Sequence, residues 1–71
     1  MSKRINVKWT NRHSGESGYV KSVKSKRGYF ENTFNQDEAK KYLNETMANS
    51  DIKLLNEIGE GKNNDFVVVT E

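Results

Sequence analysis

Ile5-Asn6-Val7-Lys8-Trp9-Thr10 is the stretch from which the fold can be worked out, because apolar and polar side chains alternate along it. A period of two places successive side chains on opposite faces of a β-strand. We therefore predict a half-buried strand over residues 4–11. Its apolar face is expected to turn toward the core, and its polar face, with Arg4, Asn6 and Lys8, toward solvent.

Two further strands are predicted on the C-terminal side of this one. A loop rich in turn-forming residues leads into a second strand over residues 19–25. Val20 and Val23 cannot share a face of a regular strand, and a β-bulge between them would repair the alternation. A turn at residues 26–28 then leads into a third strand over residues 29–34, whose two phenylalanines share one face.

The clearest helix signal in the chain begins at Asn35. Asn35 can act as an N-cap, and Glu38, three residues later, can complete a capping box. Apolar residues then recur at spacings of three and four, which is typical of one face of a helix. The pattern predicts a helix over residues 36–48, whose apolar stripe consists of Ala39, Tyr42, Leu43 and Met47.

The segment 51–58 has two interpretations. As a strand it would place Ile52, Leu54 and Ile58 on one face. As a helix it would place Ile52, Leu55 and Ile58 on one face. We favour the strand, because a separate helix of eight residues is marginal and the final strand needs a partner.

A last strand is predicted over residues 66–70, where β-branched residues follow one another. Its unbroken apolar run indicates either a central strand covered on both faces or an edge that pairs in a dimer. The complete order is β-β-β-α-β-β, an α+β fold with an antiparallel sheet and one helix packed on one face. The predicted core contains Val7, Trp9, Phe30, Phe34, Ala39, Tyr42, Leu43 and Met47.

Composition limits the class of protein. The 71 residues predict a single domain over residues 1–71, in which 32% of residues are apolar and 31% are charged. The chain contains no cysteine, so disulfides and thiolate sites are excluded. With no apolar leader and no run of membrane length, we expect a cytoplasmic protein without a membrane partner. Nine asparagines and nine lysines hint at an A- and T-rich bacterial or phage genome.

Catalytic chemistry finds little support in the sequence. The single histidine, His13, lies in a polar loop without a recognisable nucleophile and orienting acid beside it. The glycines of Gly59-Glu60-Gly61-Lys62 are too close together for a phosphate-binding loop. We therefore expect a protein that is not an enzyme, with no cofactor, metal site or small-molecule substrate.

Charge is distributed unevenly along the chain. Residues 1–30 contain eight basic residues and one acid, a net charge of +7, whereas residues 31–71 contain four basic residues and nine acids, a net charge of −5. Such asymmetry between halves indicates a charged partner.

The basic half predicts a nucleic-acid-binding surface. Its candidate residues are Arg4, Lys8, Arg12, Lys21, Lys24, Lys26 and Arg27. On the solvent face of a sheet these cations could lie along a phosphate backbone or in a major groove, and Tyr19 or Tyr29 could stack on a base. A solvated lysine-rich face and a surface for an acidic protein are the competing interpretations. The acidic half could instead serve a protein partner, as in a small inhibitor or adaptor, or a homodimer.

Residues 24–43 form a predicted strand-turn-strand-helix unit with a Thr33-Phe34 helix entry. This outline is similar to the arm-type DNA-binding domain of tyrosine recombinases, which places a three-stranded sheet in the major groove. Residues 51–71 have no counterpart in that domain, and the chain is not assigned to the family. The specific role of the protein stays open on the sequence.

Overall fold

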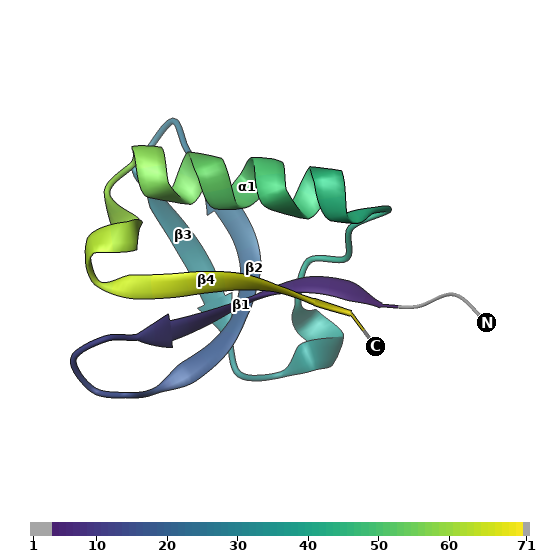
Figure 1. Cartoon of the computed structure of the whole chain (residues 1–71), viewed down its shortest axis with the longest axis horizontal. Helices are drawn as coiled ribbons and strands as arrows, with labels where there is room; N and C mark the ends of the chain where they lie inside the picture. The colour runs from purple at the N-terminus through teal and green to yellow at the C-terminus, as the bar shows by residue number, and fades with distance from the viewer. Residues whose placement is uncertain (1–3, 71) are drawn as a thin grey trace.

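The computed structural model describes residues 4–70, which form a four-stranded antiparallel sheet with an α-helix on one face (Figure 1). The strands are β1 (Ile5–Asn11), β2 (Ser17–Lys24), β3 (Tyr29–Thr33) and β4 (Asn64–Thr70), in the spatial order β3-β2-β1-β4. The helix α1 spans Glu45–Glu57, and single 3-10 turns occupy Gln36–Glu38 (η1) and Glu60–Lys62 (η2). The predicted α+β class is confirmed.

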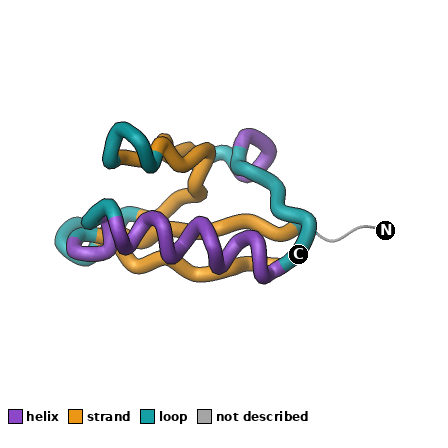
Figure 2. The backbone as a smooth tube through the Cα atoms, turned by 90° about the horizontal axis from the view of Figure 1, so that it is seen from above, coloured by secondary structure: helices purple, strands orange, loops and turns teal. Residues whose placement is uncertain are grey.

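The core lies between the sheet and α1. Pairing of Val7 with Val68 and of Trp9 with Phe66 puts these four residues on one face, and Val20 of β2 joins them. The helix contributes Ala48 and Leu55, which are both fully buried. Figure 2 shows the β2–β3 hairpin standing apart from α1, β1 and β4, which overlap in this view. We call the sheet face that carries these residues the core face and the opposite one the outer face.

The bulge predicted in the second strand is confirmed. Val20 pairs with Asn32, but Ser22 pairs with Glu31, so Lys21 is one residue in excess on β2. The extra residue shifts the alternation, and Val23 therefore returns to the core side together with Phe30, its partner on β3.

The predicted helix over residues 36–48 is wrong beyond its first turn. Asn35 does cap that turn, because its side-chain oxygen accepts a hydrogen bond from the Asp37 amide at 2.9 Å. The chain is extended again at Ala39, and the amides of Lys40 and Tyr42 donate to the carbonyls of Val20 and Ile5. These amides therefore donate to strand carbonyls and not to the carbonyls of a preceding helical turn, so the helix does not continue.

The strand favoured over residues 51–58 is also wrong, and the helical alternative holds. The helix begins six residues earlier, where the side chain of Asn44 accepts a hydrogen bond from the Met47 amide at 2.9 Å. It is therefore 13 residues long rather than eight, which removes the objection of marginal length. Ile52, Leu55 and Ile58 line its packed side. The partner of the last strand is β1, not residues 51–58.

Three predicted core residues lie at the surface, two of them, Leu43 and Met47, because the helix begins later than expected. Phe34 is 69% exposed, Leu43 is 86% exposed and Met47 is 46% exposed. Val20, Ala48 and Leu55 take their places in the buried cluster. Phe34 still touches the core at its rim, since its ring meets the buried ring of Trp9 edge-on at 5.8 Å between centroids.

The segment between η1 and α1 crosses from the sheet to the helix. Asn6, predicted to face solvent, is instead 1% exposed beneath this segment, and its amide donates to the Lys40 carbonyl at 2.8 Å. The hydroxyl of Tyr42 donates to Asp51 of α1 at 2.6 Å, and Lys40 Nζ lies 2.8 Å from the same carboxylate. Burial, this hydrogen bond and the negative charge of Asp51 raise the pKa of Tyr42.

The strand β4 lies at one edge of the sheet and not in its centre, contrary to one of the two interpretations of its apolar run. It pairs with β1 along seven consecutive residues without a bulge. In Figure 1 it lies in front of β1 and below α1. Val67 is 51% exposed on the outer face.

Candidate nucleic-acid interface

The seven candidate cations lie in two parts of the fold: β1 with its flanking residues, and the hairpin formed by β2 and β3. Arg4 precedes β1, Lys8 lies in the middle of β1, and Arg12 follows its end. The other four lie in the β2–β3 hairpin, which we define as residues 17–33, and they are Lys21, Lys24, Lys26 and Arg27. Their proximity in sequence is preserved in space because the two strands pair and the turn between them is short.

The two arginines outside the hairpin are held in ion pairs. Arg4 lies 2.8 Å from Asp37 of η1, and Arg12 lies 2.7 Å from Asp65 of β4. Each of these exposed pairs contributes less than about 1 kcal/mol to stability. Each also offsets the positive charge of its arginine locally, so neither arginine adds much to a basic surface.

The acidic half of the chain is partly neutralised by the same contacts. Asp37 and Asp65 pair with arginines of the basic half, whereas the pair of Asp51 with Lys40 lies within the acidic half. The asymmetry of +7 and −5 between the halves is therefore reduced inside the folded protein. Lys3 and Glu71, which contribute to those sums, lie outside the described residues.

The hairpin keeps most of its positive charge. It contains four basic residues and one acid, Glu31, so its net charge is +3. Among the ion pairs of residues 4–70, Lys24 reaches Glu31 at 3.7 Å, and no pair involves Lys21, Lys26 or Arg27. All four cationic side chains are exposed. The hairpin is consequently the basic element of the structure.

The tip of the hairpin is a tight turn. The amides of Arg27 and Gly28 both donate to the carbonyl of Lys24 at 3.0 Å, and Gly28 has a φ of 76°. Glycine adopts this left-handed conformation without the cost that a side chain would add. The turn thus presents two cations, Lys26 and Arg27, at the end of a two-stranded ribbon.

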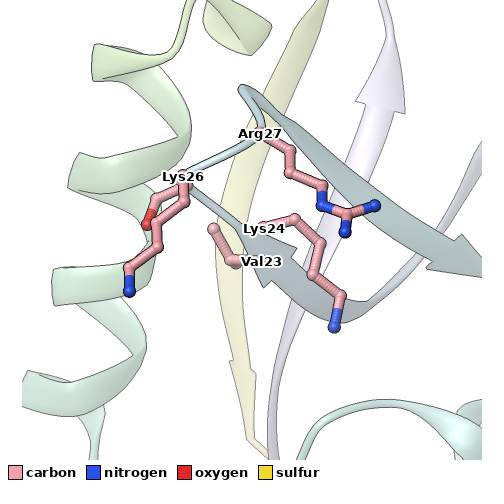
Figure 3. Close-up of a pocket in the computed structure, with 5 residues that line it drawn as sticks. Val23, Lys24, Lys26 and Arg27 are labelled. Carbon is pink, nitrogen blue, oxygen red and sulfur yellow. The ribbon is translucent and has the colours of Figure 1, made fainter.

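A surface pocket is formed by the same turn (Figure 3). Its lining consists of Val23, Lys24, Ser25, Lys26 and Arg27. In this view the side chains of Lys24 and Arg27 extend to the same side, whereas Lys26 points the other way, toward α1. Two cations that extend together can contact one phosphate group or two successive ones.

Glu31 is the residue of this surface that the sequence did not indicate. Its carboxylate accepts a hydrogen bond from Ser22 at 2.8 Å. This hydrogen bond is the main cause of a lowered pKa of Glu31, and the charges of Lys24 and Lys21 lower it further. The pairing of Ser22 with Glu31 follows from the bulge, which shifts the register by one residue. From the sequence, this contact could have been found only by working out which residues of β2 and β3 pair on each side of the bulge.

Comparison with known proteins yields no relative: no family model, curated protein or solved structure matches the chain. Within residues 4–70, no helix is long and apolar enough to cross a membrane. In that part of the chain, no group of three or more histidine, aspartate and glutamate side chains is placed so that it could hold a metal ion.

Proposed function

We propose that the protein binds nucleic acid through the β2–β3 hairpin. The observation that carries this proposal is the concentration of four exposed cations, three of them outside any ion pair of the described residues, on a ribbon that rises from the body of the fold. A two-stranded ribbon fits the grooves of nucleic acids, and lysine and arginine neutralise phosphates. The sequence predicted seven candidate cations, and the fold supports four of them most strongly.

The first prediction concerns the charge of the hairpin. Lys21→Glu, Lys26→Glu and Arg27→Glu in one variant are expected to abolish binding of a labelled oligonucleotide, measured by fluorescence anisotropy. Wild-type affinity should fall roughly 20-fold or more between about 50 mM and about 200 mM salt, as expected when three or four phosphates are contacted.

The matched control is Lys41→Glu, Lys53→Glu and Lys62→Glu, since these exposed lysines lie outside the hairpin. This variant changes the net charge by the same amount and is expected to weaken binding only a few-fold. Equal loss in the two triple variants would contradict the proposal, as would an affinity that does not change with salt. Thermal melts establish that both variants are folded.

A second candidate function is self-association through β4. The other edge strand, β3, is short, carries Glu31 and lies beside the bulge, which are features that protect an edge. The strand β4 has seven regular residues and a half-exposed Val67, it lacks lysine and proline, and its one charged residue, Asp65, is paired with Arg12. An unprotected edge of this kind can pair with a second copy of itself in a symmetric dimer.

Sedimentation velocity at several concentrations tests the dimer. If β4 pairs with itself, the wild-type protein should show a concentration-dependent dimer, and Val67→Lys should shift it to monomer because charges would face each other across the new pair. Val67→Thr keeps the β-branched shape without a charge and should still dimerise. A wild-type protein that stays monomeric at high concentration excludes this function.

A further inference from the structure

Two tyrosines lie on the outer face of the sheet. Tyr19 of β2 pairs with Thr33, and Tyr29 of β3 pairs with Lys24. Both therefore face away from Val20 and Phe30, which contact the core. Tyr29 is 41% exposed and Tyr19 is half-buried. Neither ring belongs to the buried cluster of the core.

Each of these tyrosines has a lysine directly opposite it on the neighbouring strand. Lys8 of β1 pairs with Tyr19, and Lys24 of β2 pairs with Tyr29. Directly paired residues project from the same face with their Cβ atoms about 5 Å apart. The outer face thus carries two aromatic–cation units, one near the centre of the sheet and one near the tip of the hairpin.

The two units are far enough apart to contact separate bases. Tyr29 and Thr33 are four residues apart along β3, and Thr33 is the residue that pairs with Tyr19. At a rise of about 3.3 Å per residue, the two rings lie roughly 13 Å apart along the strands. Arg27, which extends to the same side as Lys24, adds a cation at the outer end of this path (Figure 3).

Glu31 lies between the two units on the outer face, but its charge is largely offset. Ser22 donates to its carboxylate, Lys24 is 3.7 Å away, and the lowered pKa of Glu31 reflects the nearby charge of Lys21 as well. A nucleic-acid backbone that follows this face would therefore meet a net positive surface at the Tyr29 end, whereas at the Tyr19 end Thr33 donates to the carboxylate of Glu38 at 3.1 Å.

Aromatic rings on a basic sheet face discriminate between forms of nucleic acid. In a duplex the faces of the bases are covered by their neighbours, so that a protein ring can stack only on a base that has been unstacked. Single strands offer free base faces, and proteins that bind them combine a basic path with aromatic platforms. The outer face combines a basic path with two aromatic rings.

We propose that the preferred ligand of the hairpin is single-stranded nucleic acid, with one base on Tyr29 and another on Tyr19, and with phosphates on Lys24, Arg27 and Lys8. This inference rests on the proposed function, because it assigns a ligand class to the same surface. DNA and RNA strands share the chemistry that the site recognises.

The test compares an unstructured oligothymidine with a duplex of equal length, both labelled, at one salt concentration. Wild-type protein is expected to bind the single strand more tightly. Tyr29→Leu should weaken binding of the single strand about fivefold or more, since stacking on one base is worth about 1–3 kcal/mol. The same variant should change duplex affinity less than about twofold. Tyr29→Phe keeps the ring and should bind the single strand like the wild type.

The outcomes separate this inference from the proposed function. If neither ligand shows salt-dependent binding, or if the two triple-glutamate variants behave alike, the proposed function itself fails. If salt-dependent binding persists but the duplex is preferred, the assignment to single strands is overturned while the proposed function stands. The same holds if Tyr29→Leu weakens both ligands equally or neither. Because Tyr29 lies outside the core, the variant is expected to keep the thermal stability of the wild type.

Discussion

Replacing Leu55 with alanine is expected to remove most of the stability of the protein. Leu55 is fully buried between α1 and the sheet. Truncation of such a leucine costs about 2–5 kcal/mol, through lost burial and the cavity that is left. A chain of 71 residues without disulfides has a total stability of only about 5 kcal/mol. The Leu55→Ala protein should therefore keep only about 0–3 kcal/mol of stability, and its urea midpoint should fall to less than about two thirds of the wild-type value.

The matched control for this substitution is the neighbouring residue. Leu54 is 37% exposed on the same helix, so Leu54→Ala removes the same atoms and has the same effect on helix propensity, but should cost less than about 1 kcal/mol. Urea unfolding followed by the fluorescence of Trp9, the one tryptophan, measures both variants. A strand over residues 51–58 would bury Leu54 instead, and the order of the two variants would then be reversed.

Gly18→Val is expected to destabilise the protein by about 3 kcal/mol or more, because overpacking forces backbone and side chains apart. A Cβ atom on Gly18 would lie 2.8 Å from the carbonyl oxygen of Thr33 and 2.9 Å from Cζ2 of Trp9. The indole cannot turn away easily, since its Nε1 donates to the Tyr19 carbonyl at 3.2 Å and its ring contacts Phe34. The substitution would thus disturb β1, β2 and β3 together.

Ser17→Val provides the comparison for this second variant. Ser17 precedes Gly18 in β2, is exposed, and projects from the opposite face. Valine favours strands, so its introduction there should leave the urea midpoint almost unchanged. If Gly18→Val unfolds at the same urea concentration as Ser17→Val, the close approach of the indole to the backbone at Gly18 is not a constraint on the fold.

The strands could be predicted from the sequence because their signal is local. Alternation along β1 and the irregular spacing of Val20 and Val23 in β2 each reflect a period of two, with or without one extra residue. The start of the helix could not be predicted in the same way. Asn35 and Asn44 are both real N-caps. The helix begins at the second cap because the amides of Lys40 and Tyr42, which lie between the two caps, donate hydrogen bonds to carbonyls of strands distant in sequence.

The candidate site was predictable to the extent that its residues are neighbours in sequence. The hairpin cations lie within seven residues, so any pairing of β2 with β3 brings them together. The partners of the other cations are remote: Asp37 lies 33 residues from Arg4, and Asp65 lies 53 residues from Arg12. Burial of Asn6 likewise depends on a segment more than 30 residues away. Such contacts follow from the tertiary arrangement and leave no local pattern.

The pairing of β1 with β4 has a consequence for how the fold responds to force. Ile5 pairs with Thr70, so the first and last paired residues lie side by side at one end of an antiparallel ladder. Hydrogen bonds in such a ladder run across the strands. Tension applied through these two residues would load the bonds one at a time, beginning at that end, rather than shear the whole row at once. The sheet should therefore unzip under a low mechanical load, even where it resists heat or urea.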